Sequence, residues 1–171
     1  MLKKFYPDLK LKAIGDVDLD FLARKNIKGI ILDIDNTLVP EHVKRADKKV
    51  LRWIEKVKNM GFKLCIVSNA SHKRVSKFNE NLGLHAVHKA SKPRSRSFIR
   101  AMDLMNTKPM QTAVIGDQIF TDIYGGNKLG IFTILVNPID KKEIIGVRLK
   151  RILEGIILTR YQNNLQRSKN K

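Results

Sequence analysis

The chain alternates between short apolar runs and stretches in which apolar residues recur at helical spacing. Continuous apolar character over a few residues is typical of strands that are buried on both faces of a sheet. It predicts strands over 28–33, 62–67, 86–88, 112–115 and 131–136. Apolar stripes with a period near ~3.6 residues predict helices between them, over 45–60, 72–82, 94–106 and 120–129. Strands that alternate with single helices predict an α/β fold, a parallel sheet of about five strands with helices on both faces.

Length and composition limit the class of protein. The 171 residues are 43% hydrophobic, which suits one folded domain and excludes disorder of the whole chain. We expect a single domain over 1–162, comprising a core over 26–138 and a basic amphipathic helix over 140–161, followed by a disordered polar tail over 163–171. The single cysteine, Cys65, excludes an intramolecular disulfide.

No run of apolar residues approaches the roughly 20 that span a bilayer, and the N-terminus lacks the apolar centre of a signal peptide. These absences predict a cytoplasmic protein, either free or peripheral on the inner face of the membrane. Lysine and arginine total 34 against 16 aspartate and glutamate, which gives a net charge of +18. Such a charge attracts nucleic acid, anionic lipid or phosphorylated substrates, and it does not by itself choose among them.

Acidic residues follow two of the predicted strands. Asp33 and Asp35 come after the first strand, and Asp117 and Asp122 come after the fourth. Ligands of parallel sheets bind beyond the carboxyl ends of the strands, so these four side chains are candidates for one site. Carboxylates held close together need a cation or a proton between them, and an oxygen-rich set suits Mg²⁺. A single aspartate at a strand end is often only a turn former, but four at two strand ends favour a site.

Ser68, Asn69 and Lys92 follow two other strands. A hydroxyl beside backbone N–H groups at the start of a helix can bind an anion, and a lysine there can neutralise a phosphate oxygen. Two alternatives stay open at this point. Ser68 and Asn69 can instead cap the helix that begins near His72, and Lys92 can be one solvated cation among 34.

These residues, taken in order, resemble the four motifs of the haloacid dehalogenase (HAD) superfamily of phosphatases. The matching segments are Asp33-x-Asp35-x-Thr37, Ser68-Asn69, Lys92 and Gly116-Asp117-x-x-x-x-Asp122. The chain is more closely similar to the bacterial YqeG family of subfamily IIIA. That likeness includes Phe5-Tyr6-Pro7-Asp8, the run from Leu32 to Pro40, and Ile134-Leu135-Val136-x-Pro138. It extends from about Phe5 to Glu154 and implies a HAD-like, Rossmannoid sheet.

The resemblance implies a two-step phosphoryl transfer. Asp33 would be the nucleophile, and Asp35 would be the general acid and then the base. Mg²⁺ would be held by the Asp33 carboxylate, the Asp35 backbone carbonyl and Asp117, with Asp122 orienting the site or a metal-bound water. The phosphoryl group would be held by Thr37, Ser68, Asn69 and Lys92.

In HAD enzymes a cap domain inserted after the first motif or before the last commonly selects small substrates. In this chain the segments between Leu38 and Phe62 and between Lys92 and Thr112 have room for one helix each, so we expect no cap and an open site. Open, basic sites suit large anionic substrates. Some YqeG relatives release phosphate from phosphatidylglycerophosphate to give phosphatidylglycerol, and this lipid is the substrate we expect.

Two further alternatives stay open. The segment from Gly146 to Tyr161 is basic and amphipathic, so it can lie on an anionic membrane or pack against the sheet as a terminal helix. The net charge also fits a nucleic-acid or ribosome-associated protein, or a phosphatase of a phosphorylated nucleic-acid end. Few aromatic residues are interleaved with the basic ones, which argues against stacking on single strands.

Overall fold

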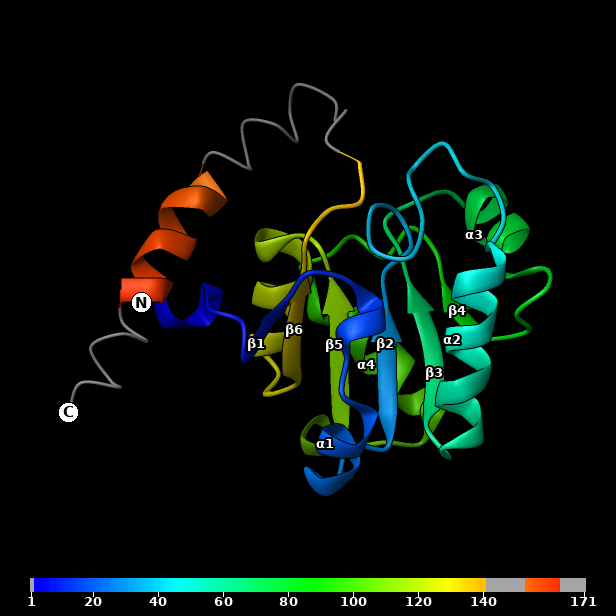
Figure 1. The fold of residues 1–171 in the computed structure, drawn as a ribbon, viewed down its shortest axis with the longest axis horizontal. Coiled ribbons are helices and arrows are strands. Elements are labelled where there is room, and N and C mark those ends of the chain that lie inside the picture. The colour runs from blue at the N-terminus through cyan, green and yellow to red at the C-terminus, as the bar shows by residue number, and fades with distance from the viewer. Residues whose placement is uncertain (1, 141–152, 164–171) are drawn as a thin grey trace.

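A computed structural model describes residues 2–140 and 153–163 of the chain. Its centre is one parallel sheet of six strands in the order β1-β6-β5-β2-β3-β4, with their carboxyl ends at the upper edge in Figure 1. The strands are β1 (Leu9–Leu11), β2 (Gly29–Leu32), β3 (Lys63–Val67), β4 (His85–Val87), β5 (Thr112–Gly116) and β6 (Phe132–Val136). The expected α/β fold with a parallel sheet is confirmed.

The edge strand β1 was not predicted from the sequence. It is three residues long, with an exposed lysine in its centre, so its apolar signal is weak. Its place depends on distant contacts: the Asp8 carboxylate accepts hydrogen bonds from Thr133 N (2.7 Å) and Thr133 Oγ1 (3.0 Å). The Asn127 amide also donates to the carbonyls of Lys4 and Tyr6. The local pattern of apolar residues could not predict β1, because contacts with residues far along the chain hold this strand in register.

The longer helices lie where the apolar stripes predicted them. They are α2 (Lys48–Asn59), capped by Asp47, α3 (His72–Asn79), capped by Ser71, and α4 (Ser95–Met105), which ends at the left-handed Asn106. The short helix α1 (Leu19–Arg24) was not predicted. In place of the single helix expected over 120–129, the chain forms a π-helical turn, η4 (Ile119–Ile123), and then α5 (Tyr124–Asn127). Short 3₁₀ turns cover Leu2–Phe5, Ile14–Asp16 and Pro109–Gln111.

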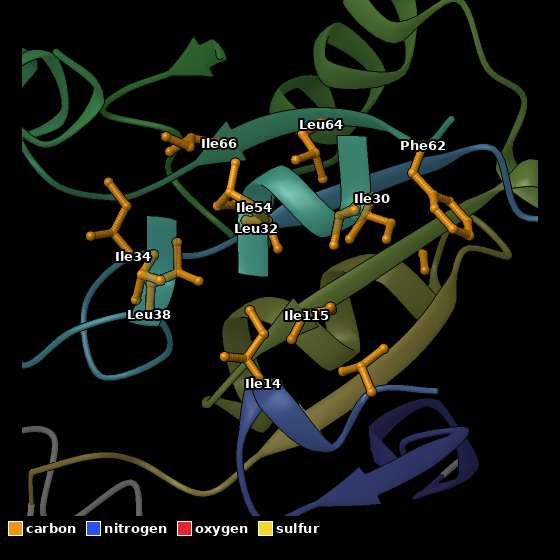
Figure 2. Close-up of a cluster of buried hydrophobic side chains, with 14 of the residues drawn as sticks. Ile14, Ile30, Leu32, Ile34, Leu38, Ile54, Phe62, Leu64, Ile66 and Ile115 are labelled. Carbon is orange, nitrogen blue, oxygen red and sulfur yellow. The ribbon is translucent and has the colours of Figure 1, made fainter. Parts of the chain in front are cut away.

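The sheet is buried on both faces, as the continuous apolar runs require. Along β2, Ile30 and Leu32 enter one core cluster and Ile31 enters the other. The first cluster takes Ile54 and its neighbours from α2, together with residues of α1 and α3, and Figure 2 shows its side chains between α2 and the sheet. The second is covered by α4. Helices on both faces make the strand ends the accessible edge of the sheet.

The connections beside the strand ends are short. The chain passes from Leu38 to Lys63 by a loop and α2, and from Lys92 to Thr112 by α4 and a 3₁₀ turn. Neither connection holds room for a cap domain within the part of the chain that the structure describes, as the sequence predicted.

The C-terminal helix covers residues 153–163 and lies beside the N-terminal segment (Figure 1). Ile157 is buried against Ile119 and Ile123, and the rings of Tyr6 and Tyr161 are 5.4 Å apart. Residues 141–152 of the helix expected over 140–161, and residues 164–171 of the tail expected over 163–171, lie outside the described residues, and residue 163 belongs to the helix. None of the described helices combines the length and the hydrophobicity that crossing a bilayer requires.

Candidate active site

Three aspartates meet at the carboxyl edge of the sheet. Asp33 follows β2, Asp117 follows β5 and Asp122 lies in η4; each offers a carboxylate oxygen within 4.8 Å of those of the other two. Their exposed fractions are only 7%, 1% and 1%. Aspartates that follow separate strands in the sequence therefore meet in one cluster, because β2 and β5 are neighbours in the sheet.

Lys92 lies inside this cluster. Its Nζ donates to Asp33 Oδ1 at 2.7 Å and to Asp122 Oδ1 at 2.6 Å, and its side chain is 3% exposed. Burial alone would lower the pKa of Lys92, but the charges and hydrogen bonds of Asp122 and Asp33 outweigh burial and raise it. Lys92 is thus a buried ammonium rather than a solvated cation.

The pKa of Asp33 is raised to about 8. Burial is the largest cause; the charges of Asp122 and Asp117 raise it further, and Lys92 opposes the shift. The chain by itself therefore disfavours the ionised form of this carboxyl, although Lys92 is in contact with it. Further positive charge beside the cluster would favour the carboxylate.

The donor set fits a hard divalent cation. With all three carboxyl groups ionised, Asp33, Asp117 and Asp122 would carry three negative charges against one positive charge on Lys92, an excess of two within these four side chains. Buried charges need compensation, and closely spaced carboxylate oxygens are ligands that Mg²⁺ prefers. The cluster does not include the Asp35 side chain.

Thr37 contacts two of the clustered carboxylates from the loop that follows β2. Its hydroxyl is 3.2 Å from Asp117 Oδ1 and 3.5 Å from Asp33 Oδ2, and the residue is 2% exposed. The loop is tight: Asn36 has a φ of +62°, and the amide of Leu38 donates to the carbonyl of Ile34. The hydroxyl therefore contacts carboxylates, and the contact with a phosphoryl group that the resemblance implied stays a prediction.

Asp122 reaches the cluster because Gly116 leaves space for it. A Cβ at Gly116 would lie 2.3 Å from Asp122 Cγ, so no other residue fits at this position without displacing the carboxylate. The second oxygen of Asp122 accepts from Gln118 N (3.3 Å) and Thr121 Oγ1 (3.2 Å). Single π-helical turns such as η4 commonly occur at functional sites.

The C-terminal helix reaches this turn through Glu154. The residue is 4% exposed, and its Oε1 accepts from Ile119 N at 2.7 Å, at the start of η4. Sequence reasoning missed this contact. A signal existed, because Glu154 is the one acid between Arg148 and Arg160 in a stretch that is otherwise basic and apolar.

Asp35 lies apart from the three buried aspartates. Its side chain is 27% exposed, and its Oδ1 accepts from Nη2 (2.8 Å) and Nε (3.2 Å) of Arg74 on α3. Sequence reasoning also missed Arg74, because a cation within a basic helix carries no spacing signal. Both hydrogen bonds from Arg74 go to Oδ1, so Oδ2 of Asp35 takes no part in the contact with Arg74.

Ser68 and Asn69 end β3 on the same edge. The Ser68 hydroxyl, 1% exposed, accepts from Ala70 N at 3.1 Å, and Asn69 Oδ1 accepts from Lys92 N at 2.8 Å. The helix cap that was the alternative for these two residues is instead made by Ser71. Asn69 also positions the backbone that carries Lys92.

A model of the family described as mitochondrial PGP phosphatase matches residues 2–140. The chain belongs to this family. It is 42% identical over 160 residues to probable phosphatase YqeG from Bacillus subtilis (strain 168), and the match covers 93% of each chain. It is 26% identical over 166 residues to phosphatidylglycerophosphate phosphatase 1, chloroplastic/mitochondrial, from Arabidopsis thaliana. That match covers 91% of this chain and 47% of the plant protein, so the chain spans about half of that relative's length.

The fold recurs in solved structures. The cobalt-bound deoxy-D-mannose-octulosonate 8-phosphate phosphatase of Haemophilus influenzae matches with a TM-score of 0.52 at 17% identity, over 81% of this chain and 91% of that chain. At this identity the likeness shows the fold alone. The expected HAD-like fold and the resemblance to the YqeG family are confirmed. As a member of the PGP phosphatase family, the protein is a HAD-type phosphatase, a phosphoric monoester hydrolase.

Proposed function

We propose that this phosphatase removes the terminal phosphate of phosphatidylglycerophosphate, with Mg²⁺ as cofactor and an aspartyl-phosphate as intermediate. The observation that supports the chemistry best is the buried cluster of Asp33, Asp117 and Asp122 around Lys92, with Asp35 two residues beyond Asp33. Phosphoryl transfer depends mainly on positioning and on compensation of charge, and this cluster supplies both.

In the first step the Asp33 carboxylate attacks the phosphorus atom. A bond forms between Asp33 and phosphorus, and the ester bond between phosphorus and the leaving oxygen breaks. Asp35 gives its proton to that oxygen, so that the leaving group departs as an alcohol. Arg74 occupies Oδ1 of Asp35, which leaves Oδ2 to carry the proton.

In the second step water attacks the phosphorus of the aspartyl-phosphate and gives one proton to Asp35. The bond between Asp33 and phosphorus breaks, which releases inorganic phosphate and restores both aspartates. The sum is hydrolysis of one phosphomonoester by one water molecule. Asp35 serves as acid and then as base, so it must keep the same position through both steps.

Four groups would hold Mg²⁺ or orient it: the carboxylates of Asp33 and Asp117, the backbone carbonyl of Asp35, and Asp122. When bound, the ion supplies positive charge that offsets the charge of the phosphoryl oxygens. Lys92 would bring a second positive charge to the same oxygens. Thr37, Ser68 and Asn69 would bind the phosphoryl group or orient the groups that do.

The substrate is proposed from three features. The plant relative is named as a phosphatidylglycerophosphate phosphatase. The site has no cap domain in the described part of the chain, so a lipid head group at a membrane surface can reach it. The net charge of +18 attracts anionic lipid, and we place the enzyme in the cytoplasm, acting at the inner face of the membrane.

The same charge favours a second candidate, a phosphatase of a phosphorylated nucleic-acid end or a protein associated with RNA. One experiment separates the two. Phosphate release is measured with Mg²⁺ from phosphatidylglycerophosphate in mixed micelles, a soluble phosphomonoester and a 3′-phosphorylated oligonucleotide. The Asp33→Asn variant is the control.

Release from the lipid that greatly exceeds release from the other substrates, and that is lost in the control, is the expected result. Release from the oligonucleotide alone would overturn the lipid assignment and support the nucleic-acid candidate. Full turnover by Asp33→Asn would overturn the aspartyl-phosphate mechanism.

A further inference from the structure

A basic groove runs along α3 beside the active site. It lies between α3 and Lys44, and we call it the α3 groove. The charged or ionisable side chains that line it are Lys44, His72, Lys73, Arg74, Lys77 and Glu80. Glu80 is the one acid among them, and it is bound by Lys77 (2.9 Å) and by Arg45 (3.1 Å). The groove therefore presents positive charge to solvent.

Two of its lysines are available to a ligand. Within the described residues no acidic oxygen lies within ion-pair distance of Lys44 or Lys73, and both are exposed. Arg74 connects the groove to the site, since it binds Asp35 through Nε and Nη2 while its Nη1 donates to the Lys44 carbonyl at 3.4 Å. The cations thus begin at the Asp35 carboxylate and continue outward along α3.

The position of the groove relates it to the leaving group. The general acid must lie against the oxygen that departs, so the remainder of the substrate extends past Asp35. Asp33, Asp117 and Asp122 are buried, whereas Asp35 is partly exposed and is held from the α3 side. A leaving group that carries its own negative charge would meet Arg74 first and then Lys44 and Lys73.

We propose that the α3 groove binds a second anionic group, a phosphodiester, in the leaving group of the substrate. This inference rests on the proposed function, because phosphatidylglycerophosphate carries a phosphodiester one glycerol away from the phosphate that is removed. The groove would then select a monoester whose alcohol bears a phosphodiester over a simple phosphomonoester. Lys44 and Lys73 would be specificity residues that take no part in the chemical steps.

The test uses two soluble substrates, so that membrane binding does not contribute. One is the deacylated head group, which has the phosphomonoester and the phosphodiester, and the other is glycerol 3-phosphate, which has only the monoester. The variant Lys44→Ala/Lys73→Ala should lower kcat/KM for the head group about five- to tenfold, the size expected for two exposed charge contacts. It should change kcat/KM for glycerol 3-phosphate less than about twofold.

The matched control is Lys28→Ala/Lys63→Ala, which removes two exposed lysines at the amino ends of β2 and β3, the edge of the sheet opposite the active site. It lowers the net charge by the same amount and should leave kcat/KM for both substrates unchanged. The inference would be overturned if the groove variant lost kcat/KM equally on both substrates. It would also be overturned if the control variant lost as much kcat/KM for the head group as the groove variant does. So would a wild-type enzyme that shows no preference for the head group.

A binding experiment makes the groove testable apart from catalysis. Glycerophosphoglycerol, which has the phosphodiester and no monoester, is titrated into the Asp33→Asn protein and followed by amide NMR. Shifts confined to α3 and to the loop around Lys44, lost when Lys44 and Lys73 are alanine, would support the groove even if the lipid proved not to be the substrate. Absence of these shifts would overturn the groove even if the lipid were cleaved.

Discussion

Glu154 on the C-terminal helix accepts a hydrogen bond from the backbone amide of Ile119, three residues before Asp122. The carboxylate lies at the first turn of η4, where backbone N–H groups have no partner within the turn and favour negative charge. It connects the C-terminal helix to the turn that aims a candidate metal ligand. We infer that Glu154 is a positioning residue for Asp122.

Replacing Glu154 by alanine should therefore weaken Mg²⁺ binding. We expect the Mg²⁺ concentration for half-maximal activity to rise about three- to tenfold, and the increase in Tm that Mg²⁺ causes to shrink, because an unsatisfied buried amide loosens η4. Glu154→Gln keeps an acceptor oxygen and should restore most of the affinity. Glu55→Ala, at an exposed glutamate of α2, is the control. A loss of kcat with unchanged Mg²⁺ dependence would argue against this role.

Asp33→Asn should lower kcat at least about a thousandfold, because an amide cannot serve as the nucleophile. The metal-free protein should nevertheless unfold at the same or a higher temperature than the wild type. Burial raises the pKa of Asp33 to about 8, so its ionised form is costly in the fold, and asparagine removes that cost without changing the shape. Thermal unfolding in EDTA checks this. A clear fall in Tm would show that the Asp33 carboxylate stabilises the metal-free fold, contrary to this expectation.

Gly116→Ala should reduce activity at least about a hundredfold, because the new Cβ would take the place of the Asp122 carboxylate. The measurement is kcat/KM on a soluble phosphomonoester together with Mg²⁺ binding by calorimetry. Gly15→Ala is the matched control, since a Cβ there has no heavy atom within 4 Å and the φ is not positive. A fully active Gly116→Ala enzyme would show that activity does not depend on the position of the Asp122 carboxylate.

Cys65 should resist alkylation in the folded protein. The thiol is buried in β3, and burial raises its pKa to about 12, so almost no thiolate exists at a pH of about 8. Iodoacetamide at that pH should modify the native protein at least about a hundredfold more slowly than the protein in denaturant, as followed by intact mass. Rapid modification of the native protein would indicate that β3 opens.

Much of the fold could be predicted from local pattern. Strands such as β2 and β5 are continuous apolar runs, and parallel pairing follows from the single helices between them. The elements that were missed, β1 and α1, are short, and the position of β1 depends on contacts such as that of Asp8 with Thr133, 125 residues away. The π-helical turn was also missed, because apolar spacing does not distinguish it from the start of an ordinary helix.

The sequence by itself determined which residues are candidates for the chemistry: Asp33, Asp35, Asp117, Asp122 and Lys92 all follow strands, and strand ends in a parallel sheet share one edge. Only the tertiary structure decided which of them form the buried cluster and which lies outside it. Lys92 is enclosed by Asp33 and Asp122, while Asp35 turns outward to Arg74. Partners of this kind come from separate elements, and side-chain contacts between them depend on strand order and helix placement. Spacing along the chain does not encode those contacts, and this is why Arg74 and Glu154 emerged only from the fold.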